Sequence, residues 1–152
     1  MRIGVVSDSH GAVGRLGGLL MAMEAGGPLD AVIHLGDGYH DLDEYRAHLP
    51  AVYQVAGNCD WMHSDTEDLL VLSGARILIT HGHSYQVRLG LDSLLGQAIK
   101  DRAQAALYGH THVPRCEWRN GILLLNPGAA QDGRYAILTI NRLGAVDAQL
   151  FE

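Results

Sequence analysis

The sequence predicts a single-domain α/β protein in which two mixed β-sheets pack together and helices cover the outside. Three observations support this fold class. Strand-like apolar runs alternate with segments of helical periodicity through the first two thirds of the chain. The remaining third carries hairpin signals and is rich in strand-like sequence. No linker, composition shift or internal repeat divides residues 1–152, so we expect one domain.

The first half of the chain begins as a βαβ unit. Residues 2–6 form a short apolar strand. Apolar residues then recur at helical spacing over 13–23, until Gly26-Gly27-Pro28 ends the helix. Residues 31–35 form the next strand, which runs into Gly36-Asp37-Gly38.

The middle of the chain continues this alternation with shorter elements. Asp41 and Glu44 have the spacing of a capping box, which predicts a short helix that ends at Pro50. Residues 51–56 read as a third strand. Two apolar runs on either side of Ser73-Gly74 predict a hairpin over 68–80.

The end of the chain predicts mostly antiparallel strands. A second amphipathic helix over 91–99 precedes a short strand at 105–108. Asn120-Gly121 lies between two strand-like runs and is the strongest short hairpin signal. Residues 135–140 and 145–151 form a last pair of strands.

Composition excludes several classes of protein. The chain of 152 residues is 47% hydrophobic, which is typical of a globular domain, and its formal net charge is −6. This charge argues against a broad basic face for nucleic acid, although a nucleotide held at a metal centre remains compatible with it. The two cysteines, Cys59 and Cys116, are too far apart in sequence to suggest a disulfide framework.

The sequence predicts a cytoplasmic protein without a membrane partner. Strand-like sequence begins at Arg2 and leaves no room for a signal peptide. The longest apolar runs fall well below the roughly 18 residues of a membrane span. Whether copies of the chain associate as a homo-oligomer is left open.

Polar residues of metal-ligand type follow the predicted strands. Asp8 and His10 are two residues apart, so in extended backbone their side chains would point to the same side. Further candidates follow later strands at Asp37, Asn58, His81, His83, His110 and His112. Imidazole, carboxylate and amide ligands without thiolate suit manganese, iron, zinc, nickel or cobalt. The candidates are too many for one tetrahedral ion and fit two ions that share a carboxylate.

These motifs, taken in order, resemble the calcineurin-like metallophosphoesterases. The series is Asp-x-His, Gly-Asp, Gly-Asn-x-Asp, His-Gly-His and Gly-His-Thr-His, and it runs with Asn126-Pro127-Gly128 over nearly the whole chain. Gly57-Asn58-Cys59-Asp60 and Asn126-Pro127-Gly128 are similar to the small bacterial and archaeal phosphodiesterase branch.

The resemblance implies a four-layer αββα sandwich and a dinuclear metal centre. It assigns one ion to Asp8, His10 and His112, the other to Asn58, His81 and His110, and places Asp37 between them. We expect two divalent transition-metal ions, with manganese first and zinc, nickel, iron or cobalt as alternatives. The implied reaction is in-line attack of a bridging hydroxide on a phosphodiester, with the developing charge stabilised by both metals.

Other residues receive roles by their place in these motifs. The catalytic candidates are Asp37, Asn58, Cys59 and His83, and the substrate-binding candidates are His63 and Arg134. Many members of the wider superfamily carry a histidine where this chain has Cys59, and that histidine can protonate a leaving group. Its replacement favours diesters with good leaving groups over monoesters.

Several histidines have simpler structural interpretations. His34 lies on a buried strand and is predicted to be a core residue with satisfied hydrogen bonds, whereas His40 and His48 are expected to be solvated.

Three functions compete on the sequence alone. A hydrolase of small or nucleotide-like phosphodiesters is preferred. A phosphomonoesterase or nucleotide pyrophosphatase could use the same metals. A binding scaffold like the retromer subunit that shares this fold would tolerate degraded ligands, whereas every ligand position is intact here.

Overall fold

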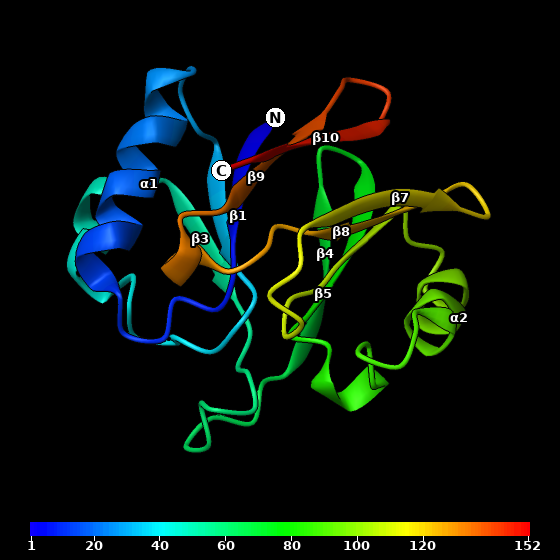
Figure 1. Ribbon diagram of the computed structural model, residues 1–152. Helices are drawn as coiled ribbons and strands as arrows, with labels where there is room; N and C mark the ends of the chain where they lie inside the picture. The colour runs from blue at the N-terminus through cyan, green and yellow to red at the C-terminus, as the bar shows by residue number, and fades with distance from the viewer.

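The computed structural model describes residues 1–152 and contains two five-stranded sheets packed face to face (Figure 1). The first sheet has the order β10-β9-β1-β2-β3 and the second the order β4-β5-β6-β8-β7. The strands of the first sheet are β1 (Arg2–Val6), β2 (Ala31–His34), β3 (Ala51–Gln54), β9 (Tyr135–Ile140) and β10 (Val146–Phe151). Those of the second are β4 (Glu67–Leu72), β5 (Ala75–Thr80), β6 (Ala105–Leu107), β7 (Arg115–Arg119) and β8 (Ile122–Asn126).

Two helices cover the outer faces of the sheets. Helix α1 (Val13–Ala25) packs its buried face, which includes Leu16 and Met23, on the outer side of the first sheet. Helix α2 (Asp92–Lys100) packs on the outer side of the second sheet through Leu94 and Ala98. Figure 1 shows the two helices on opposite sides of the molecule. Helix, sheet, sheet and helix form the four layers that the sequence resemblance implied.

The largest core cluster lies between the two sheets. It takes residues from both, and on β1 its members are Ile3 and Val5. Val6 instead belongs to the cluster under α1, because successive side chains of a strand point to opposite faces. Strand β1 is therefore buried on both faces, as its apolar sequence requires.

Both predicted hairpins are present. Strands β4 and β5 pair antiparallel around Ser73-Gly74, and β7 and β8 pair around Asn120-Gly121. All four turn residues have positive φ, which is the backbone that a type I′ hairpin turn demands. Asn and Gly tolerate this conformation, so the sequence signal had a direct physical basis.

The capping box predicted at Asp41 and Glu44 is wrong. The segment is a 3₁₀ helix, η1 (Asp43–His48), with Leu42 as its N-cap and no side-chain capping bond. Asp41 Oδ2 instead accepts hydrogen bonds from Ser9 Oγ at 2.6 Å and from Gly11 N–H at 2.8 Å. A contact to the loop after β1 has thus replaced the local cap.

Two further 3₁₀ turns, η2 (His83–Tyr85) and η3 (Ala130–Asp132), flank the loops described below. No helix combines the length and apolar character that crossing a membrane requires.

Candidate metal centre

The loops that follow β1, β2, β3, β5 and β6 carry the predicted ligands. Strands β1, β2 and β3 run parallel to one another, and so do β5 and β6. The carboxyl ends of parallel strands meet at one edge of a sheet, where α/β proteins place their ligands. The long-range packing of the two sheets then brings the two sets of loops together.

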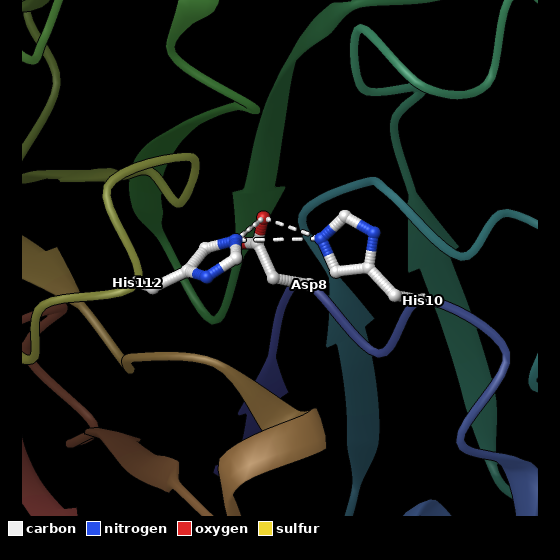
Figure 2. Close-up of side chains that lie close together, drawn as sticks. All are labelled: Asp8, His10 and His112. Atoms are coloured by element: carbon white, nitrogen blue, oxygen red, sulfur yellow. Dashed lines mark hydrogen bonds and ion pairs between the residues drawn. The ribbon is translucent and has the colours of Figure 1, made fainter.

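One group of donor atoms comprises Asp8, His10 and His112, which Figure 2 shows pointing toward one another. Asp8 Oδ1 lies 3.1 Å from His112 Nε2 and 3.6 Å from His10 Nε2, and the two imidazole nitrogens are 3.3 Å apart. Donor atoms around one tetrahedral ion with bonds of about 2.0–2.1 Å are themselves about 3.4 Å apart. The spacing therefore fits one shared ion.

A second group of donor atoms comprises Asp37, His81 and His110. Asp37 Oδ2 is 3.3 Å from His81 Nε2 and 3.7 Å from His10 Nε2, so it lies between members of the two groups. Its other oxygen, Oδ1, accepts a hydrogen bond of 2.8 Å from the backbone N–H of Cys59. This geometry suits a carboxylate that serves two ions.

Two of the candidate metal-binding atoms, Asp8 Oδ1 and His81 Nε2, are buried without a hydrogen-bond partner. The other polar atom of each side chain does have a partner. Asp8 Oδ2 accepts from Ser7 Oγ at 2.5 Å and from His110 N–H at 3.1 Å, while Oδ1 is unpaired. His81 Nδ1 donates to Leu35 C=O at 2.7 Å, which leaves the lone pair of Nε2 unpaired. Buried polar atoms are seldom orphaned. A metal ion would satisfy both, so the residues present fit a metal.

The protonation states of Asp37 and His110 suit metal ligands. Burial raises the pKa of Asp37, but the His81 imidazole and the Cys59 N–H favour its carboxylate more strongly, so the net pKa is held below its usual range. Burial, and then His81, lower the pKa of His110, which favours neutral imidazole. Metals bind carboxylates and neutral imidazoles.

The backbone at these ligands is not the extended strand that the Asp8–His10 spacing assumed. Asp8 and His10 have φ of 55° and 45°, and Asp37, His110 and His112 have φ of 58°, 70° and 62°. Left-handed backbone costs a non-glycine residue roughly 1–2 kcal/mol. The two side chains of the Asp-x-His motif therefore converge through strained turns beyond β1. Such strain concentrates at functional sites, where the surrounding structure holds it.

Asp60 is a positioning residue to which sequence reasoning gave no role. Its Oδ2 accepts from the N–H groups of Asp37 at 2.7 Å and Gly57 at 2.8 Å. Its Oδ1 accepts from those of Gly38 at 3.1 Å and Tyr39 at 3.2 Å. One carboxylate thus ties the Asp37 loop to the Asn58 loop. The motif Gly-Asn-x-Asp carried the signal, but nothing local shows what the aspartate binds.

Asn126 performs a similar task for the last ligand loop. It is fully buried, and its Nδ2 donates to Gly109 C=O at 3.2 Å and to Thr111 Oγ1 at 3.0 Å. Its Oδ1 accepts from Gly128 N–H at 2.9 Å. The side chain therefore braces the turn that presents His110 and His112.

The catalytic candidates of the 57–60 and 81–83 motifs lie in different settings. Asn58 is exposed, and its Nδ2 is 3.7 Å from Cys59 Sγ, so its role as a metal ligand stays a prediction. Cys59 Sγ lies within 4.8 Å of donor atoms of His10 and Asp37, close to the candidate centre. Burial, and then the Asp37 carboxylate, raise the pKa of this thiol in the metal-free protein. The His83 ring centroid is 5.5 Å from that of His81, which places it beside the second group.

The substrate-binding candidates are divided between two regions. His63 lies in a pocket that Cys59 also lines. Arg134 Nη1 donates to the backbone carbonyl of His112 at 3.4 Å, and so supports a ligand loop. Contact of His63 and Arg134 with substrate stays a prediction.

The remaining histidines agree largely with their simpler interpretations. His34 is fully buried: Gly36 N–H donates to its Nδ1, and its Nε2–H donates to Ser9 Oγ at 2.9 Å. Burial lowers its pKa to about 4. His40 and His48 are exposed as expected, but His40 is not merely solvated, because it contacts Asp43 and His63.

Comparison with families of known proteins agrees with this geometry. The model of the calcineurin-like phosphoesterase superfamily domain matches residues 1–142. The probable metallophosphoesterase YsnB of Bacillus subtilis is 33% identical over 147 residues, covering 92% of this chain and 85% of that protein. A phosphodiesterase of Methanocaldococcus jannaschii is 28% identical over 151 residues, covering 84% and 83% of the two chains.

Solved structures share the fold over the whole length. A predicted phosphoesterase from Streptococcus pneumoniae superposes with a TM-score of 0.76 at 26% identity, covering 99% of this chain and 96% of that one. Vps29 of Entamoeba histolytica superposes with a TM-score of 0.77 at 20% identity, covering 99% and 98%. The second likeness concerns the fold alone.

Proposed function

The chain belongs to the calcineurin-like phosphoesterase superfamily, and we propose that it is a phosphodiesterase that works with two divalent metal ions. Membership of this family implies divalent metals, and the donor groups described above supply places for them. The observation that carries the proposal is the position of Asp37 between the two groups of donor atoms. One carboxylate shared by two such groups is the arrangement of a dinuclear centre.

We assign Asp8, His10 and His112 to one ion, and His81, His110 and Asn58 to the other, with Asp37 shared. When bound, two divalent ions would lower the pKa of a water molecule and stabilise charge on the phosphoryl oxygens. The protein orients the donors: Ser7 Oγ and the His110 N–H hold Asp8, and Leu35 C=O fixes the tautomer of His81. Such outer contacts set both ligand direction and basicity.

The charge of the ligand set favours an anionic substrate. Among the proposed ligands only Asp8 and Asp37 are carboxylates. Two divalent ions bring four positive charges, so the loaded centre keeps a net positive charge. A phosphodiester monoanion is therefore attracted to it without any nearby lysine.

Diester rather than monoester hydrolysis is supported by two observations. Cys59 stands where many superfamily members have a histidine acid, and the Methanocaldococcus jannaschii relative is named a phosphodiesterase. A nitrophenyl diester releases a stable anion and needs no protonation of the leaving group. An enzyme without a strong general acid can hydrolyse such a substrate.

The test combines metal reconstitution with substrate comparison. Protein stripped of metal and reloaded with Mn²⁺, Zn²⁺ or Ni²⁺ is assayed with bis(4-nitrophenyl) phosphate and with 4-nitrophenyl phosphate. We expect turnover to require metal and the diester to react faster. Equal or faster turnover of the monoester would indicate a phosphomonoesterase instead.

The Asp37→Ala variant tests the shared carboxylate. It should lose bound metal, measured by elemental analysis, and should lose diesterase activity, because it removes the group placed between both sites. Asp147→Ala removes an exposed carboxylate on the edge strand β10 and serves as the matched control. An Asp37→Ala protein with two metals and full turnover would contradict the dinuclear proposal.

A binding scaffold is the second candidate, because Vps29 shares the fold. A scaffold needs no turnover, so metal-loaded protein inactive on every diester and monoester would favour it.

A further inference from the structure

A pocket of about 260 Å³ opens beside the metal centre, between segments 38–41 and 59–63. Gly38 follows Asp37 directly, and Cys59 Sγ lies within 4.8 Å of the donor atoms of His10 and Asp37. A phosphate held at the metals would therefore place one of its ester groups at the mouth of this pocket. We call it the aromatic pocket, for the residues described next.

Aromatic side chains form its wall. The rings of Tyr39 and His63 stack with centroids 3.9 Å apart and an angle of 15° between their planes. Trp61 is 83% exposed and Met62 is 77% exposed, although both line the pocket. A tryptophan and a methionine exposed side by side expose apolar surface that a planar ring could cover.

A hydrogen-bonded chain fixes the edge of this wall. His40 Nδ1 lies 2.8 Å from Asp43 Oδ2, and His40 Nε2 lies 3.0 Å from His63 Nε2. In the neutral His40 ring, Nδ1–H donates to Asp43, so Nε2 carries no proton. His40 Nε2 therefore accepts a hydrogen bond from His63 Nε2–H. The stacked ring of His63 is thereby held in a defined orientation before any ligand arrives.

The charge of the pocket selects against a second phosphate. None of its nine lining residues is lysine or arginine, whereas Asp41 and Asp60 are among them. Both carboxylates are already engaged, Asp41 by Ser9 and Gly11 and Asp60 by backbone N–H groups. An uncharged planar group fits this lining, and a phosphate or a polyphosphate tail does not.

We propose that the aromatic pocket binds the base of a nucleotide-type phosphodiester, stacked on Trp61 and the Tyr39–His63 pair while its phosphate lies at the metals. The inference rests on the proposed function of the centre. The pocket is smaller than the roughly 300–1,000 Å³ of sites that enclose drug-sized ligands. It therefore accommodates one base and does not enclose the rest of the substrate.

The experiment compares two ligands that differ only in the base. AMP and ribose 5-phosphate are titrated by calorimetry into Mn²⁺-loaded protein. We expect AMP to bind at least tenfold more tightly, a difference that corresponds to about 1.4 kcal/mol and lies within the range of base–aromatic stacking. Trp61→Ala should weaken AMP binding about tenfold and leave ribose 5-phosphate unchanged.

Matched variants separate the pocket from general effects. Trp118→Ala removes the only other tryptophan, which is 54% exposed on β7, and should change neither affinity. Tyr39→Ala, checked for folding by circular dichroism, should reproduce the loss seen with Trp61→Ala. In Trp118→Phe, AMP should quench the remaining indole of Trp61, and ribose 5-phosphate should not.

Several results would overturn the proposal: equal affinity for the two ligands, no measurable AMP binding, or unchanged AMP affinity in both pocket variants. The binding readout needs no turnover. A protein that prefers AMP but hydrolyses nothing would refute the proposed function alone. An active diesterase that binds AMP and ribose 5-phosphate equally well would refute only the proposal that the aromatic pocket binds a base.

Discussion

Asp60→Asn isolates the contribution of the carboxylate that joins the Asp37 loop to the Asn58 loop. The substitution keeps the shape of the side chain and changes one oxygen to an amide. In the wild-type protein each carboxylate oxygen of Asp60 accepts hydrogen bonds from two backbone N–H groups. The four donors are Asp37 and Gly57 on one oxygen and Gly38 and Tyr39 on the other. An amide keeps one acceptor oxygen, so one pair of N–H groups would face an NH₂ group that cannot accept.

The magnitude follows from those two lost hydrogen bonds. Burial raises the pKa of Asp60, but the backbone donors, led by Gly57, outweigh it, so the group is ionised at neutral pH. Hydrogen bonds to charged groups contribute about 1.5–3 kcal/mol each. Because the side chain is only partly buried, water can replace some of the loss. We therefore take the low end of this range, about 1.5 kcal/mol for each of the two lost hydrogen bonds. The free energy of unfolding should then decrease by about 3 kcal/mol.

The assay is urea denaturation of metal-free protein at pH 7, together with metal titration of the folded variant. The Asp37 loop should be less ordered, so the affinity for the two ions that Asp37 is proposed to share should fall as well. Asp65→Asn makes the same change of charge at an exposed position of the same loop and is the control. A loss of stability below 1 kcal/mol with wild-type metal affinity would refute the anchoring role of Asp60.

Three further predictions follow from single residues. Histidine in the unfolded chain has a pKa near 6.5, whereas burial lowers the pKa of His34 to about 4. The free energy of unfolding should therefore fall by up to about 3 kcal/mol as the pH drops through that window. Urea denaturation of His34→Asn should show a smaller pH dependence. In Gly57→Ala the new Cβ would lie 2.6 Å from the backbone nitrogen of Asp37; calorimetry should show at least tenfold weaker metal binding, whereas Gly18→Ala, with open space around it, should bind normally. Cys59→Ala should keep most activity on a nitrophenyl diester, and Cys59→His should accelerate alkyl diesters by about 10²–10⁴-fold; a hundredfold loss in Cys59→Ala with both metals retained would make the thiol catalytic.

The sequence by itself determined most of the helices and strands. It also identified the side chains of the two groups of candidate metal-binding atoms. Apolar periodicity identified α1 and the strands, and Ser73-Gly74 and Asn120-Gly121 identified the two hairpins. These signals are local, because a period of two or 3.6 residues and a turn at positive φ are properties of neighbouring residues. Asp8, Asp37 and His81 were likewise readable, because each follows a strand whose end is marked by a glycine turn.

Only the tertiary structure decided how these parts meet. Strand β9 pairs antiparallel with β1, so Arg2 lies opposite Thr139, and no local pattern specifies a partner so distant in sequence. The same holds for the four N–H groups on Asp60 and for the replacement of the Asp41 cap by contacts to Ser9 and Gly11. Side-chain hydrogen bonds go to whichever donor the packed chain brings nearest, and burial fixes which of them water cannot replace. For that reason the list of candidate ligands came from the sequence, whereas the strained turns and anchors that aim these side chains came from the fold.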